Sequence, residues 1–223
     1  MHVVIDIETK RDSDFMDQAD VAVALQAGIK VPGNYSKPDS IAKYQADGWI
    51  KMVERAATRP LTGKIVCIGL GYLHDDGEPF TIAGKDEREI LNKFAKWIGI
   101  QNCLILWCGW RVRSFDIPFI TARSAICDVE LPGGWPTRRW DNRVIDLAEI
   151  LDSEHDTQLD TWLMRMKLPL KTGHGSQVED MSDDEIVEYC SNDVVRERML
   201  LKKFSASIPT LRANSNANEA DYM

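Results

Sequence analysis

Short apolar runs alternate along most of the chain with segments of helical periodicity. The runs are bounded by glycine, proline or charged residues, which is the pattern of strands in a sheet. The run 103–108 is apolar on both faces, as is typical of a strand in the middle of a covered sheet. We expect five strands, at residues 3–9, 65–72, 79–82, 103–108 and 143–147.

Between these runs, apolar residues recur at three- and four-residue spacing, which predicts amphipathic helices. The clearest helix covers 86–98, where the apolar residues fall on one face. Capping boxes, in which a Ser or Thr precedes an acid by three positions, are predicted at Thr157 and Ser182. We expect helices at 86–98, at 118–125, from 159 onward and at 182–204.

The order of these elements predicts an α/β fold with a mixed sheet and helices packed against it. Residues 11–60 are polar and mixed, and they are far longer than a hairpin connection, so we interpret them as an insertion between the first and second strands. The last residues are rich in Asn, Ala and Ser. We therefore expect one domain over 1–210, which includes the insertion, and a flexible tail over 211–223.

Composition narrows the class of protein. The net charge is −8, which argues against coating nucleic acid by bulk electrostatics but not against holding a chain end through metal ions. No apolar run approaches the roughly 18 residues needed to span a bilayer, and the start lacks a signal-peptide pattern. We expect a cytoplasmic protein, either bacterial or a phage protein acting in the bacterial cytoplasm. The five cysteines form no C-x-x-C pair, so buried reduced thiols are expected rather than a zinc site.

Two acids on the first strand point to metal chemistry. Asp6 and Glu8 are two positions apart, so they share one face of a strand while Ile5 and Ile7 occupy the other. Adjacent carboxylates on a core strand repel each other, and a divalent cation with oxygen ligands relieves that repulsion. A strand end whose acids reach solvent is the alternative.

Two further acids occupy positions that suit the same site. Asp116 follows a buried strand at the start of a helix, where an ordinary helix cap is the alternative. Asp193 lies four residues after Tyr189, one turn along the same helix face. A surface acid paired with Arg196 or Arg198 is the alternative there, although Cys190 and Val194 turn Asp193 toward the core.

The order D-x-E, F-D and Y-x-x-x-D resembles the DEDDy branch of the DnaQ-like 3′→5′ exonucleases, which have an RNase H-like fold. The likeness is to free-standing relatives of the exonuclease domain of family B DNA polymerases. The histidine of the other branch would stand five residues before the last aspartate, where this chain has Glu188. The resemblance covers most of the chain outside the insertion, including 157–193.

The resemblance implies an activity and its partners. Asp6, Glu8, Asp116 and Asp193 would hold two Mg²⁺ or Mn²⁺ ions, and Tyr189 would orient the attacking water. The products would be nucleoside 5′-monophosphates cut from single-stranded DNA or frayed 3′ ends. A separate polymerase or a replication or repair protein would be a partner, and a membrane would not. An RNA-trimming exonuclease and a non-catalytic nucleic-acid-binding module are the alternatives.

The resemblance also implies substrate contacts from Thr9, Arg111 and Phe115. Arg111 stands where family B exonucleases usually have an asparagine that holds the substrate strand. Arginine can grip phosphate with two hydrogen bonds, so binding can be kept by other means.

Two further features have weaker signals. Asp146 lies on an apolar strand, where it could support the metal ligands from behind, and a structural role is its simpler interpretation. The run 138–140 and Arg143 mix cationic and aromatic side chains, which suits a single strand or equally a solvated loop.

Overall fold

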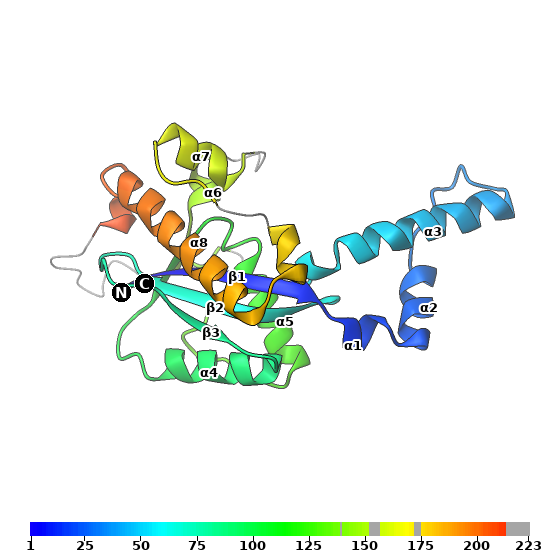
Figure 1. The fold of residues 1–223 in the computed structure, drawn as a ribbon, viewed down its shortest axis with the longest axis horizontal. Helices are drawn as coiled ribbons and strands as arrows, with labels where there is room; N and C mark the ends of the chain where they lie inside the picture. The colour runs from blue at the N-terminus through cyan, green and yellow to red at the C-terminus, as the bar shows by residue number, and fades with distance from the viewer. Residues whose placement is uncertain (139, 152–156, 172–174, 213–223) are drawn as a thin grey trace. The chain divides into compact units, whose positions relative to one another are not determined.

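The computed structural model describes residues 1–138, 140–151, 157–171 and 175–212. Five strands form one sheet in the order β3-β2-β1-β4-β5, of which Figure 1 labels β1, β2 and β3. Strands β1 and β4 are parallel, as are β4 and β5, whereas β2 and β3 are antiparallel. The predicted α/β class with a mixed sheet is therefore confirmed. The strands are β1 His2–Arg11, β2 Gly63–Tyr72, β3 Phe80–Ala83, β4 Leu106–Gly109 and β5 Val144–Asp146.

The register puts the carboxyl ends of the three parallel strands at one edge of the sheet. His2, Val3 and Val4 pair with Leu106, Trp107 and Cys108, and Gly109 pairs with Asp146. The pairing of β1 with β4 ends at Val4, although β1 itself continues. The chain that follows β4 therefore leaves the sheet beside the middle of β1.

Alternation along β1 separates two packed layers. Val3, Ile5 and Ile7 join the core shared with α4 (Glu87–Gly99) and α5 (Asp116–Ile126). Val4 joins the core on the other face, which is shared with the long helix α8 (Asp183–Phe204). Figure 1 shows α4 and α8 on opposite sides of the sheet. Asp6 and Glu8 have the same parity as Val4 and therefore face α8.

Apart from α8, the helices that follow β5 are short. The capping box predicted at Ser182 is present, since Ser182 and Glu185 exchange hydrogen bonds at the start of α8. The one predicted at Thr157 is not found, because Gln158 occupies the N-cap and makes no side-chain cap bond. The short helices are α6 Leu147–Leu151, α7 Leu159–Arg165 and the 3₁₀ turns η2 Gly175–Asp180 and η3 Pro209–Leu211.

The chain divides into two compact units, one of Met1–Glu8 with Ile65–Met223 and one of Thr9–Lys64. The second unit overlaps the segment 11–60 that the sequence predicts as an insertion. Asp12 caps its first helix by accepting from the amide of Phe15. Its helices are α1 Ser13–Met16, α2 Ala19–Ala27, α3 Pro38–Glu54 and the turn η1 Ala56–Thr58.

Three further expectations, on the cysteines, the tail and membrane spans, can be compared with the structure. All five thiols are free, but Cys103 is exposed rather than buried, because β4 begins only at Leu106. Of the expected tail, Leu211 is buried and 213–223 lie outside the described residues. Over the part of the chain that the structure covers, no helix has the length and apolarity to cross a membrane.

Candidate active site

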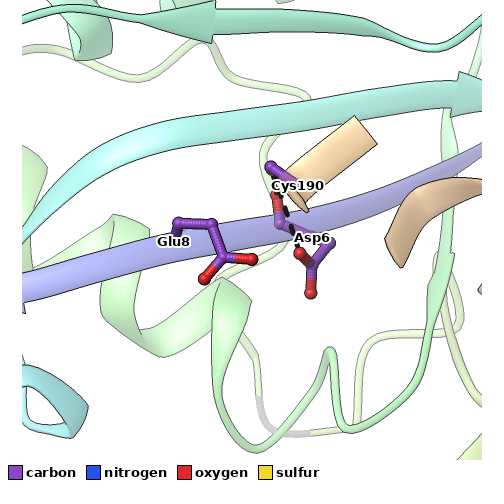
Figure 2. A group of neighbouring side chains, drawn as sticks. All are labelled: Asp6, Glu8 and Cys190. Atoms are coloured by element: carbon purple, nitrogen blue, oxygen red, sulfur yellow. Dashed lines mark hydrogen bonds between the residues drawn. The ribbon is translucent and has the colours of Figure 1, made fainter. Parts of the chain in front are cut away.

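Two acids and a thiol meet between β1 and α8. One ligand atom each from Asp6, Glu8 and Cys190 lies within 4.8 Å of the others, and Figure 2 shows the three side chains together. The Cys190 Sγ is 3.7 Å from the backbone oxygen of Asp6 and 3.9 Å from its Oδ2. The strand thus presents both carboxyl groups to one face of the helix.

Asp193 comes to the same region from one turn further along α8. Its side chain is 1% exposed, so the alternative of a surface acid does not hold. It does pair with Arg196, whose Nη1 lies 3.2 Å from Oδ1. Its other oxygen accepts from the ammonium of Lys171, and that ammonium also lies 5.9 Å from the centre of the Tyr189 ring.

Asp116 reaches β1 from the start of α5. Its Oδ1 accepts a hydrogen bond from the backbone amide of Ile7 at 3.0 Å, between the two strand acids in sequence. Its side chain is 3% exposed. The charge of Asp193 raises the pKa of both strand acids, and the charge of Asp6 raises that of Asp116, yet the oxygens of Asp116 and Asp193 are outside the 4.8 Å group.

Mutual repulsion and burial dominate the electrostatics of this site. Removal from water, together with the charge of Asp193, raises the pKa of Asp6 to about 7. Burial and then the charge of Asp6 raise the pKa values of Glu8 and Asp116 well above their ordinary range. Burial lowers the pKa of Lys171, but the charges of Asp6 and Asp193 outweigh it and the net shift is upward. The site therefore holds more carboxyl groups than its neighbouring cations neutralise.

Two members of this constellation were not singled out from the sequence. Lys171 precedes a loop with no recognisable spacing to the acids. Glu197 lies four residues after Asp193, so the helical period could have shown that they share a face. It is 4% exposed, it accepts from the amide of Trp110 at 3.1 Å, and burial followed by the charges of Asp6 and Asp116 raises its pKa.

The turn between β4 and α5 is held by Asp146. Its Oδ1 accepts from the amide of Arg111 at 3.0 Å, and its Oδ2 accepts from the amide of Arg113 at 2.9 Å. Arg111 has φ = 62°, in the left-handed region that asparagine tolerates better than arginine. An asparagine at this position would therefore suit the backbone better than arginine does. Asp146 has the structural role that is its simpler interpretation.

The other predicted substrate contacts lie at the ends of elements. Phe115 is the N-cap residue of α5, and its half-buried ring packs 5.5 Å from that of Phe119. Thr9 is buried in β1 directly after Glu8, and it is the first residue of the Thr9–Lys64 unit. The roles of Thr9, Arg111 and Phe115 toward a substrate stay predictions.

A separate pocket of about 480 Å³ lies at the opposite edge of the sheet, where β4 and β5 begin. Trp140 is 67% exposed there, and Arg143 forms an ion pair with Asp141. Arg139 lies outside the described residues. The mixed cationic and aromatic run therefore lines a pocket remote from the acids. The lining residues are Leu104, Gly133, Trp135, Thr137, Arg138, Trp140, Asp141, Asn142 and Arg143.

A comparison with known families decides the affiliation. Residues 65–223 match a family described as a predicted 3′-5′ exonuclease related to the exonuclease domain of PolB. The chain belongs to this family. The match includes Asp116, Tyr189 and Asp193, but it begins at residue 65, after the strand that carries Asp6 and Glu8.

A solved structure supports the fold of this exonuclease-related family member. The family B DNA polymerase of the hyperthermophilic archaeon Pyrobaculum calidifontis matches with a TM-score of 0.59 and 15% sequence identity. The match covers 91% of this chain and 24% of the polymerase chain. At that identity the likeness shows the fold, which is RNase H-like as predicted. No curated protein matches the chain.

Proposed function

We propose that the chain is a metal-dependent 3′→5′ exonuclease that releases nucleoside 5′-monophosphates from single-stranded DNA or frayed DNA 3′ ends, with two Mg²⁺ or Mn²⁺ ions. The observation that carries the proposal is the gathering of Asp6, Glu8, Asp116 and Asp193 around the middle of β1. The affiliation with predicted 3′-5′ exonucleases supports the polarity of cleavage. Ends left by a separate polymerase or by replication or repair proteins are the expected substrates.

The donor set fits hard divalent cations. Buried carboxyl groups that repel one another gain most from a bound cation, and Mg²⁺ and Mn²⁺ prefer oxygen ligands. Asp6, Glu8, Asp116 and Asp193 would hold the ions. Bound ions of this kind neutralise charge on a scissile phosphate and lower the pKa of an attacking water.

Tyr189 suits the task of a hydrogen-bond donor. Burial raises the pKa of its phenol, although the charge of Lys171 opposes the shift, so the hydroxyl keeps its proton at neutral pH. A protonated hydroxyl can orient a water molecule but cannot accept its proton. Lys171 places a positive charge beside Asp193 and limits the repulsion among the acids.

The test is digestion of a 5′-labelled single strand by the wild type and by Asp6→Asn, in Mg²⁺, in Mn²⁺ and in chelator. We expect a ladder that shortens from the 3′ end, with 5′-monophosphates as products, only when a divalent ion is present. Loss of a ligand to the ions should slow cleavage by about 10²- to 10³-fold, as with other essential electrostatic groups. A matched RNA oligonucleotide tests the RNA-trimming alternative in the same assay.

Asp128→Asn is the matched control for this substitution. Asp128 is exposed, and its φ of 52° is one that asparagine tolerates. This variant should digest DNA at the wild-type rate. Magnesium-dependent digestion that persists in Asp6→Asn would refute the proposed site.

A further inference from the structure

A sulfur atom lies inside the group of oxygen ligands. We propose that Cys190, together with Asp6 and Glu8, binds a thiophilic divalent cation such as Zn²⁺ or Cd²⁺, which inhibits cleavage by occupying the catalytic centre. The inhibition rests on the proposed exonuclease function, whereas the binding does not. Mg²⁺ takes oxygen ligands, while Zn²⁺ and Cd²⁺ favour thiolate, so one buried thiol changes the preference of the site.

The spacing of the donor atoms fits a bound ion. In a tetrahedral zinc site, bonds of about 2.3 Å to sulfur and about 2.1 Å to oxygen put the two ligand atoms about 3.6 Å apart. The Cys190 Sγ and the Asp6 Oδ2 are 3.9 Å apart, and the Glu8 oxygen completes a group within 4.8 Å. Small rotations of the two acids would close the site around the cation (Figure 2).

The sulfur is held in this position by the neighbouring strand. A Cβ added at Gly69 on β2 would lie 2.8 Å from the Cys190 Sγ, so the thiol packs directly on the strand backbone. The thiol of Cys67, on the same strand, hydrogen-bonds to Cys190. A second sulfur is thus adjacent to the first, on the same side as the acids.

The two acids beside the thiol are also placed to bind a cation. Glu8 is 6% exposed, and its ligand oxygen lies within 4.8 Å of one from Asp6. A divalent cation between these carboxyl groups would neutralise their charge. Binding forms a sulfur–metal bond and carboxylate–metal bonds, and it releases the thiol proton to solvent.

The experiment is a Cd²⁺ titration of the full chain without Mg²⁺ or nucleic acid, followed by the ultraviolet charge-transfer band of cadmium thiolate. The wild type should develop the band with one equivalent of Cd²⁺, and Cys190→Ser should lose it. Cys103→Ser removes the exposed thiol and should keep the band. Cys190→Ala, checked by circular dichroism, replaces the serine variant if that does not fold.

Proton release gives a second reading. Calorimetric titration in two buffers of different ionisation enthalpy should count one more proton released by the wild type than by Cys190→Ser. In the DNA digestion, the Zn²⁺ concentration that halves the rate should be at least about tenfold higher for Cys190→Ser.

The outcomes separate the two proposals. A one-equivalent band that depends on Cys190 supports the thiophilic site even if no DNA is digested. A wild type without this band, or a band that persists in Cys190→Ser, overturns the site even if DNA is digested rapidly.

Discussion

The molecule contains two groups of buried carboxyls with opposite surroundings. Glu87, at the start of α4, is enclosed by Arg123, whose Nη2 lies 2.6 Å from Oε2 and whose Nε lies 3.0 and 3.1 Å from the two oxygens. The amide of Ile65 donates to the same carboxylate at 2.7 Å. Both oxygens of the Glu87 carboxylate therefore accept hydrogen bonds from the protein, including those of a paired cation.

The acids beside β1 have no comparable balance. Burial raises the pKa values of Asp6, Glu8, Asp116 and Glu197. The charge of Asp193 adds to the rise at Asp6, and the charge of Asp6 adds to it at the other three, while Lys171 opposes the rise at Asp6, Glu8 and Glu197. A paired buried charge stabilises a fold only modestly, whereas an unbalanced group costs stability and persists where it serves a function. The contrast between the two groups shows which buried acids are balanced by donors of the protein and which are not.

The largest effect on stability should come from breaking the balanced pair. Glu87→Gln leaves Arg123 buried without its counter-charge and should lower the free energy of unfolding by about 3–5 kcal/mol. Urea denaturation measures the change. Glu89→Gln, on the same helix, removes an exposed pair with Lys93 and should cost under about 1 kcal/mol. An equal loss of unfolding free energy in Glu87→Gln and Glu89→Gln would contradict the stronger role given to the buried pair. A comparable loss in metal-free Asp6→Asn would contradict the contrast between the two groups of acids.

Tyr189→Phe should have the next largest effect, on the rate of cleavage. A hydrogen bond to a charged or polarised partner contributes about 1.5–3 kcal/mol, so the rate should fall roughly ten- to a hundredfold. This is less than the loss expected for Asp6→Asn. Single-turnover digestion of a labelled strand measures it, and equal losses in the two variants would refute the orienting role.

The metal-free protein should lose stability as the pH rises. The pKa of Asp6 is about 7 in the folded chain against an ordinary 3.8, so the folded state holds its proton more tightly. Its contribution to stability is complete below about pH 4 and disappears as the pH approaches 7. Thermal unfolding across this range in chelator should show the decline. Mg²⁺ should reduce the decline. Asp6→Asn should show a smaller decline than the wild type, with the remainder due to Glu8, Asp116 and Glu197; an equal decline in that variant would contradict the contribution of Asp6.

The smallest effect concerns the backbone beside the acids. Arg111→Asn relieves a left-handed conformation and should raise the free energy of unfolding by about 0.5–1 kcal/mol. Lys167, with φ = 55°, offers the matched substitution Lys167→Asn away from the acids. A gain at 167 with none at 111 would mean that the bond from Arg111 to the oxygen of Thr157 outweighs the strain.

The sequence predicted those parts of the fold that depend on the spacing of residues within one strand or helix. Alternation along β1 predicts that Ile5 and Ile7 enter the core while Asp6 and Glu8 face the other way, and the packing agrees. Helical spacing places Tyr189 and Asp193 on one face, and both are buried.

Contacts between distant segments were beyond that reasoning. Lys171 and Asp193 form an ion pair although they are 22 residues apart, and no spacing in the sequence encodes that contact. Cys190 was expected to be a buried thiol, which it is, but its position next to Asp6 depends on how α8 crosses β1. The exposure of Cys103 was missed because an apolar run extends before the first paired residue of β4.

The brevity of β4 has a consequence for how the acids are assembled. Since its ladder with β1 stops at Val4, the amide of Ile7 is released from strand pairing and donates instead to the carboxylate of Asp116. The Asp116 side chain thus accepts a hydrogen bond that a backbone carbonyl of a neighbouring strand would otherwise accept. A longer β4 would satisfy that amide with a carbonyl, expel the aspartate and close the gap in which the carboxyl groups meet.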